Sequence, residues 1–254
     1  MKFMAVGLLI ALAVSAAAFA EPTRISVSVL SKGAKFVGTS LGGARVTLKD
    51  AMTGEVLAQG VTQGSTGNTD KIMVKQHKPG GPVSSEGSAR FVATLEIDEP
   101  RLIEVSAYGP MAQLQATNRV SSTQWVVPGK HITGGDGWRL ELPGFAVDVL
   151  VPPSHVKLSG VPQEVPLRAN VTMMCGCPIE PDGLWDANRF EVKALLKQDG
   201  EFVGELPLRY AGSTSQFEAT WKVETTGIYE AVVYAYDPAN GNTGLDRVSF
   251  SVRE

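Results

Sequence analysis

Short segments in which apolar and polar residues alternate recur along this chain, and they constrain its fold more than any other feature. The alternation is found at residues 25–29, 46–48, 91–97, 190–196 and 217–223. Successive side chains of a β-strand point to opposite faces, so a period of two predicts strands with one buried face. Clusters of Gly, Asn, Pro and Ser separate these segments, as expected for antiparallel strands joined by turns. The sequence therefore predicts an all-β protein of two β-sandwich domains in tandem.

The first 20 residues have the three parts of a secretory signal. Lys2 supplies the positive start, residues 6–14 form an almost unbroken apolar run, and Ala18-Phe19-Ala20 is a small-x-small cleavage site. The apolar run is shorter than the ~20 residues that a membrane span needs, and no later run approaches that length. We therefore expect residues 1–20 to be a signal peptide and the mature chain, without a membrane span, to be periplasmic or secreted.

Charge and length further limit the functions and the number of domains that this chain can have. The formal net charge of −3 is spread along the chain, whereas a nucleic-acid-binding protein would show a basic patch. No zinc-hydrolase His-Glu-x-x-His motif and no phosphate-binding glycine loop occurs. The mature chain is long enough for two domains of about 100 residues each, and a domain of that size buries a core without disulfides. We expect no nucleic-acid partner, no catalytic residues and no cofactor.

The first domain is predicted to span residues 21–152. Its segment Gly43–Asp50, followed by Thr53–Ala58, contains a D-x-x-T-G turn between two strand-like runs. This pattern resembles the first hairpin of transthyretin-like or carboxypeptidase-regulatory-like sandwiches, and the resemblance implies a fold more than a function. Residues 62–88 are rich in Gly, Ser, Thr, Lys and Pro, which predicts a long loop or a hairpin around Ile72–Val74.

Two tryptophans lie near the end of this domain, at Trp125 and Trp138. They are expected either to cover the core from a closing hairpin or to form an aromatic surface for a ligand. Burial is the usual fate of tryptophan between strand-like runs, so we favour the first interpretation. Val151-Pro152-Pro153 follows as a stiff candidate linker to a second domain at residues 153–254.

The second domain contains a pattern that resembles one kind of sandwich. Gly227-Ile228-Tyr229, followed by alternating apolar residues, resembles the tyrosine corner of immunoglobulin-like domains. The run from Tyr234 to Asn242 is similar to the last hairpin of bacterial immunoglobulin-like domains. Where antibody domains have a cysteine two residues after the corner tyrosine, this chain has Ala231, so their inter-sheet disulfide is absent.

Both cysteines of the chain lie in the segment Met173-Met174-Cys175-Gly176-Cys177. Counting by twos from Val171, Met173, Cys175 and Cys177 are predicted to project to one side of the strand, whereas Met174 has the opposite parity. In an immunoglobulin-like sandwich this segment begins the B–C loop, which shares one end with the F–G loop. That end, called the pole here, would gather six further residues, Asp182, Trp185, Asp186, Asp237, Asn240 and Asn242.

Three interpretations of this sulfur cluster follow. An exported chain with two cysteines favours a Cys175–Cys177 disulfide, with Gly176 providing the kink that so short a bridge needs. Thiolate and thioether together are the ligands that select Cu(I), so Cys175, Cys177, Met173 and Met174 are a candidate copper site. The third interpretation is packed free thiols. We favour the disulfide.

Other candidate metal ligands have simpler explanations. No histidine is close enough in sequence to complete a zinc site with the cysteines, and His77, His131 and His155 are expected at the surface. The oxygen-rich segment Asp237–Asn242 invites a calcium interpretation, but Asp-Pro and Asn-Gly are ordinary turn formers. The sequence favours a turn.

These observations predict a non-catalytic binding or accessory module that acts through loops carried on β-sandwiches. Its expected partner is a protein of the bacterial envelope. The alternative is a periplasmic copper-handling or thiol-redox protein that uses Cys175 and Cys177.

Overall fold

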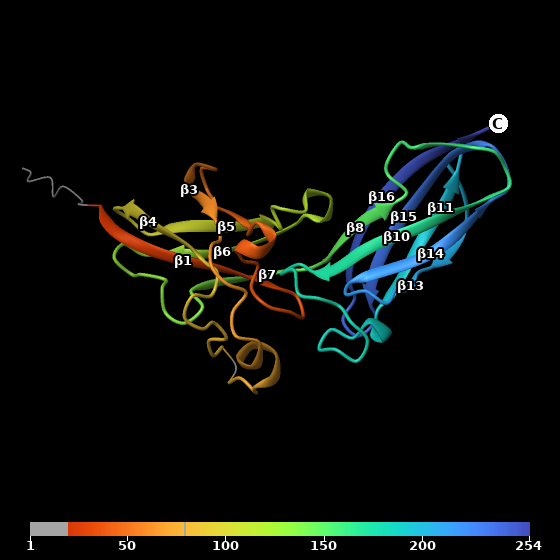
Figure 1. The fold of residues 1–254 in the computed structure, drawn as a ribbon. Coiled ribbons are helices and arrows are strands. Elements are labelled where there is room, and N and C mark those ends of the chain that lie inside the picture. The colour runs from red at the N-terminus through yellow and green to blue at the C-terminus, as the bar shows by residue number, and fades with distance from the viewer. Residues whose placement is uncertain (1–19, 79) are drawn as a thin grey trace, which may run out of the picture.

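The computed structural model describes residues 20–78 and 80–254, and over these residues the protein is all-β, as predicted (Figure 1). Four sheets form two β-sandwiches that lie end to end. The predicted signal peptide, apart from Ala20, lies outside the described residues. In the described part of the chain, no helix is long and apolar enough to cross a membrane.

The first sandwich packs a three-stranded sheet on a four-stranded sheet. In spatial order, the strands of the three-stranded sheet are β4 (Phe91–Ile97), β1 (Glu21–Ser31) and β7 (Trp138–Leu142). Those of the four-stranded sheet are β3 (Val56–Val61), β2 (Arg45–Asp50), β5 (Arg101–Gly109) and β6 (Asn118–Val126). The predicted alternation is visible in β4, where Ala93, Leu95 and Ile97 are buried and the residues between them are exposed. Apolar burial of this kind is the main stabilising contribution to such a core.

The second sandwich packs a four-stranded sheet on a five-stranded one. In spatial order, the strands of the four-stranded sheet are β13 (Arg209–Tyr210), β14 (Gln216–Val223), β10 (Gln163–Met173) and β8 (Phe145–Val151). Those of the five-stranded sheet are β12 (Glu201–Pro207), β11 (Glu191–Gln198), β15 (Gly227–Asp237), β16 (Asn242–Arg253) and β9 (Lys157–Ser159). The neighbours are antiparallel except β16 and β9, which run parallel. The alternation at 217–223 places Phe217, Trp221 and Val223 in the core.

Strand β8 belongs to the second sandwich, although the sequence analysis placed it in the first domain. It pairs with β10, with Phe145 opposite Met173, so the chain passes between the sandwiches at Pro143-Gly144 and not at residue 152. The prolines Pro152 and Pro153 lie instead between β8 and β9, which are strands of opposite sheets of one sandwich. Proline ends sheet pairing whether a strand changes sheet or a domain ends, so the sequence did not distinguish the two.

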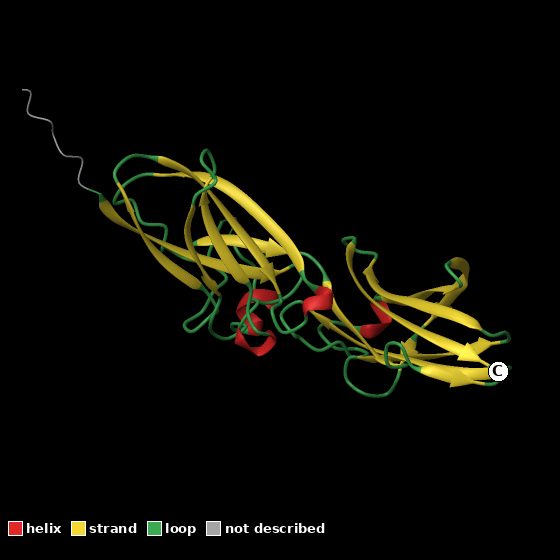
Figure 2. Cartoon of the chain, turned by 90° about the horizontal axis from the view of Figure 1, so that it is seen from above, coloured by secondary structure: helices red, strands yellow, loops and turns green. Residues whose placement is uncertain are grey.

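The segment at 62–88 is a long loop, as predicted, but the alternative of a hairpin around Ile72–Val74 is wrong. A single helical turn, η2 (Asp70–Val74), stands there, one of the few helical turns visible in Figure 2. The loop closes over a small apolar cluster of Phe36, Val83 and Ala89.

Asp136 anchors this loop to the first sandwich. Its carboxylate accepts hydrogen bonds from the backbone N–H of Val83 at 3.1 Å and of Ser84 at 2.8 Å, and it pairs with Arg139 at 2.9 Å. Burial by itself would raise the pKa of Asp136, but the hydrogen bonds from Ser84 and Val83 and the Arg139 charge outweigh it, so the pKa is lowered.

The variant Asp136→Asn is expected to be less stable than the wild type by about 2 kcal/mol at pH 6, because hydrogen bonds to a charged acceptor are lost. A lowered folded-state pKa stabilises the protein above the unfolded value of about 3.9, and this stabilisation is lost as pH falls through the folded value. The difference between wild type and variant, measured by urea unfolding, should therefore shrink between pH 6 and pH 3. The exposed Asp70→Asn variant is the control, and a pH-independent difference would contradict the assignment.

Candidate functional site

The sulfur cluster closes the end of strand β10 as a tight turn. Cys175 and Cys177 lie at disulfide distance, as predicted, with sulfur atoms 2.18 Å apart and Cα atoms 5.4 Å apart. The N–H of Gly176 donates to the carbonyl of Met173 at 2.7 Å, and the N–H of Met173 donates to the carbonyl of Cys177 at 3.1 Å. Gly176 has a φ of 76°, in the left-handed region that favours glycine.

The four sulfur atoms are divided between two cores. Met173, Cys175 and Cys177 pack in the core of the second sandwich, as their parity predicts. Met174 has the opposite parity and is fully buried in the core of the first sandwich. Copper coordination requires sulfur ligands that converge on one point, and this division does not favour it. Among the described residues, no group of three or more His, Cys, Asp or Glu side chains is placed to hold a metal ion.

The two sandwiches exchange side chains where they meet, in a region called the junction here. Met174 enters the first core, while Ala34, from the loop after β1, is buried in the second core. Gly144, with a φ of 132°, lies against Met174, since a Cβ at this glycine would come within 3.1 Å of the Met174 sulfur. The close approach and the positive φ both favour glycine at this position.

Asn242 closes the junction from the other side. Its Oδ1 accepts from the N–H of Gly144 at 2.7 Å, and its Nδ2 donates to the carbonyl of Gly144 at 2.9 Å. Residues of the 173–178 turn and of the 237–245 loop thus meet at one glycine. The predicted placement of both segments at one end of the second sandwich is confirmed.

Polar contacts extend the junction across the pole. The indole N–H of Trp185 donates to the carbonyl of Gly33 at 3.0 Å, and Lys32 Nζ donates to the carbonyl of Asn240 at 2.9 Å. Trp185 is only 8% exposed. The pole therefore faces the first sandwich instead of an open ligand site.

Two of the three pole carboxylates, Asp186 and Asp237, have structural partners. Asp186 accepts from the N–H of Asn188 and of Asp182, and these hydrogen bonds lower its pKa. Asp237 accepts from the N–H of Ala239 at 2.9 Å and from the Asn240 side chain at 2.7 Å. These are turn-stabilising bonds, the role that the sequence favoured over calcium binding.

A Gly-x-Ser-x-Gly spacing at Gly38–Gly42 also belongs to the junction. In α/β-hydrolases this spacing forms a strand-to-helix elbow that exposes the serine. Here Ser40 lies in the short 3₁₀ turn η1 (Thr39–Leu41) between strands, and its hydroxyl lies 3.5 Å from the carbonyl of Cys175. The local backbone is not that of a nucleophile elbow.

The two tryptophans have different environments. Trp138 is 7% exposed and donates to the Ser122 hydroxyl at 2.7 Å, so its prediction as a core-covering residue is confirmed. Trp125 is 63% exposed, and for it the same prediction is wrong. Strand β6 presents Val126 to the core instead, and its alternation places Trp125 on the outer face opposite Leu102.

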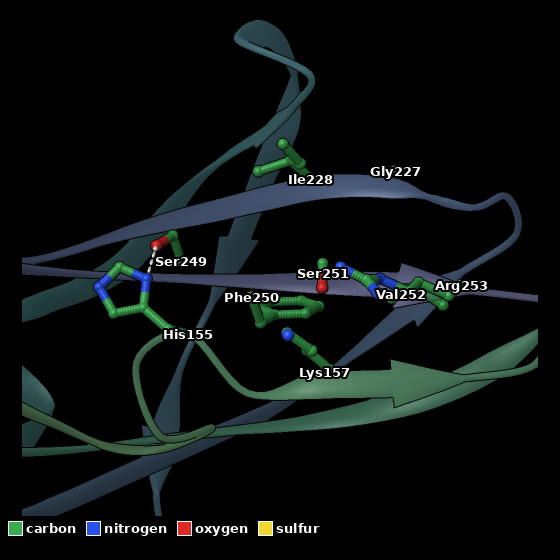
Figure 3. Close-up of a pocket in the computed structure, with 9 residues that line it drawn as sticks. All are labelled: His155, Lys157, Gly227, Ile228, Ser249, Phe250, Ser251, Val252 and Arg253. Atoms are coloured by element: carbon green, nitrogen blue, oxygen red, sulfur yellow. Dashed lines mark hydrogen bonds between the residues drawn. The ribbon is translucent and has the colours of Figure 1, made fainter.

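The three histidines lie at the surface, as predicted. The Nδ1 of His131 accepts from the N–H of Arg24 at 3.2 Å. His155 lies at the rim of a surface cavity of about 430 Å³ on the second sandwich (Figure 3). Lys157 and Arg253 line the same cavity. The sequence did not indicate it, because these three side chains meet only through the pairing of β9 with β16.

Mass spectrometry of the mature protein, expressed in a periplasm, tests the state of the cysteines. The intact protein should be two hydrogen atoms lighter than its reduced form and should resist alkylation, because both sulfurs are buried and bonded to each other. Reduced, denatured protein, which should take up one alkyl group per cysteine, is the control. A copper adduct that disappears in Cys175→Ser would contradict the disulfide and support the metal site.

Comparison with known proteins does not identify a family. No protein-family model and no curated protein matches the chain. A solved structure of an engineered protein is 18% identical with a TM-score of 0.32. The alignment covers 50% of this chain and 24% of the engineered one, and a likeness this distant carries no argument about function.

Proposed function

We propose that this protein is a non-catalytic accessory module of the bacterial envelope that presents binding surfaces on two β-sandwiches held in a fixed relation. The observation that carries the proposal is the reciprocal packing at the junction, where Met174 fills the first core and Ala34 the second. Interfaces between domains are mobile unless they are large and apolar. Because each sandwich packs a side chain into the core of the other, the interface between them should resist bending. In this proposal the sulfur cluster has a structural role.

The topology of the second sandwich supports an immunoglobulin-type carrier. Strands β13-β14-β10-β8 face β12-β11-β15-β16, which is the arrangement of strands D-E-B-A against C′-C-F-G, and β9 adds a fifth strand beside β16. The hydroxyl of Tyr229 donates to the carbonyl of Thr225 at 2.6 Å, as in a tyrosine corner. In the first sandwich, Asp50 accepts from the N–H of Met52 and of Thr53, which closes the turn that resembles transthyretin-like hairpins.

The disulfide supports the proposed location. Disulfides persist in oxidising compartments such as the periplasm, and the sequence begins with the features of a secretory signal. We therefore propose that the protein is periplasmic or secreted and contains this buried disulfide. The copper-handling or thiol-redox alternative requires accessible sulfur, whereas Cys175 and Cys177 are 1% and 3% exposed.

Two exposed aromatic residues indicate where a protein partner would bind. Trp125, on edge strand β6, is 63% exposed, and Phe202, on edge strand β12, is 61% exposed. Aromatic side chains are enriched at protein interfaces, and edge strands offer free backbone groups. We propose that one or both of these edges contacts the envelope partner.

Photo-crosslinking in the native envelope tests the proposed function. A photoreactive amino acid is placed at Trp125 or Phe202, with exposed Lys222 on the opposite sheet as the matched control. One envelope protein crosslinked from an edge but not from Lys222, and bound again by the purified wild type, is the expected result. Hydrolytic turnover by the purified protein, or equal labelling at all three positions, would overturn the proposal.

A further inference from the structure

We propose that the cavity in Figure 3 binds the carboxylate of an apolar organic acid. This site is independent of the junction and of the proposed envelope partner. It lies on the outer face of the five-stranded sheet, where β9 pairs with the last residues of β16 and where β15 begins. Ser251–Arg253 form this end of β16, while Asn242 at its other end is in the junction, so the cavity opens far from the first sandwich.

The cavity has a positive half. His155, Lys157 and Arg253 line it, and no carboxylate is among its lining residues. Within the described residues, none of these three side chains is within 4.0 Å of an acidic oxygen. A guanidinium and an ammonium without counter-charges favour an anion, and the planar guanidinium matches a carboxylate.

The acidic groups nearest the cavity either bond to other residues or lie at the margin of the cavity. Glu230, across from Ser249 on β15, pairs with Lys197 at 3.1 Å. Asp199 accepts from the N–H of Ile228 at 2.8 Å, behind Gly227. Glu254 follows Arg253 in sequence, and Arg247 adds a further cation on the same face of β16. The lining of the cavity therefore carries cations and no carboxylate, whereas the nearest acidic groups stand at its margin.

The cavity also has an apolar half and fixed hydrogen-bonding groups. Ile228 is 64% exposed at its edge and offers an apolar contact surface beside the cations. Ser249 and Ser251 supply hydroxyls between the apolar and the basic side, and Ser249 lies 3.4 Å from Nδ1 of His155.

The backbone holds His155 in place. Its φ is 62°, a conformation uncommon for residues other than glycine, and its N–H donates to the carbonyl of Ser249. Positive charge, hydroxyls and an exposed isoleucine in one cavity together select an anion attached to an apolar group.

NMR titration of the isotope-labelled mature chain with three small probes tests this proposal. Octanoate carries both features, acetate carries only the carboxylate, and octanamide carries only the apolar chain. We expect octanoate to shift the amide signals of residues 155–157, 227–228 and 249–253 in a saturable way, with acetate and octanamide at least tenfold weaker. The double variant Lys157→Gln/Arg253→Gln should lose at least tenfold in octanoate affinity, because the carboxylate loses both of its charge-assisted hydrogen-bond donors.

Matched variants separate the site from general charge. Lys222→Gln removes one cation from the opposite sheet and should bind octanoate like the wild type, whereas Ile228→Ser should weaken octanoate but not acetate. A peptide with a C-terminal leucine, as free acid and as amide, identifies the source of the carboxylate. Acid-selective peptide binding tighter than octanoate indicates a chain terminus, and weaker binding indicates a free acid. No saturable octanoate shift, or equal affinity in the double variant, would overturn the proposal.

Discussion

Replacing Met174 with alanine is expected to lower the free energy of unfolding by about 2–5 kcal/mol, the range for truncating a fully buried methionine. The side chain is 0% exposed and lies in the core of the first sandwich, although the chain segment that carries it belongs to the second. Its loss leaves a cavity between the sandwiches that the rigid sheets on both sides cannot close. Urea unfolding followed by circular dichroism measures the change.

The matched control for this variant is Met52→Ala, the same truncation at a methionine that is 77% exposed in the turn after β2. It should change the free energy of unfolding by less than about 0.5 kcal/mol. The Met174 variant should also separate the unfolding of the two sandwiches into distinct transitions, because the largest buried apolar side chain exchanged between them is gone. A single transition with wild-type stability would show that the junction is not held by Met174.

Replacing Asn242 with alanine is expected to lower the free energy of unfolding by about 3 kcal/mol. Asn242 is 1% exposed and satisfies both the N–H and the carbonyl of Gly144. Alanine leaves those two backbone groups buried without partners, and each such group costs about 1–3 kcal/mol. Urea unfolding gives the total, and hydrogen exchange at the Gly144 amide gives the local effect, which should be a loss of protection.

Asn188→Ala is the control for the asparagine variant, since Asn188 is exposed and its backbone N–H, which bonds to Asp186, is kept in alanine. Because Met174 and Asn242 both contact Gly144, the double variant should also be non-additive by at least about 0.5 kcal/mol. Strict additivity, or unchanged exchange at Gly144, would mean that the two side chains do not stabilise a common junction.

Several features of the candidate site followed from sequence periodicity. Counting by twos along β10 placed Met173, Cys175 and Cys177 on one side of the strand, and all three lie in one core. The same count placed Met174 on the opposite side of the strand but did not predict which core it packs in. Periodicity states which residues share a face of a strand, whereas the identity of the facing core depends on how the two sandwiches are joined.

Periodicity also did not predict which tryptophan is exposed to solvent. Trp138 and Trp125 both lie near turn-forming residues, yet one is 7% and the other 63% exposed. The difference of one residue in register, which presents Val126 instead of Trp125 to the core, is decided by the pairing of β6 with β5. Register depends on contacts between segments far apart in the chain, and a shift of one residue turns every side chain to the other face.

The sequence by itself determined the all-β class, the tyrosine corner around Tyr229 and the proximity of the two cysteines, because each depends on residues within a short stretch of chain. Only the tertiary structure decided that the chain crosses between sandwiches at Gly144. The cavity of His155, Lys157 and Arg253 likewise required the parallel pairing of β9 with β16, strands separated by most of the second sandwich. Local patterns encode strands and turns, whereas sheet neighbours and junctions are selected by long-range packing and hydrogen bonding.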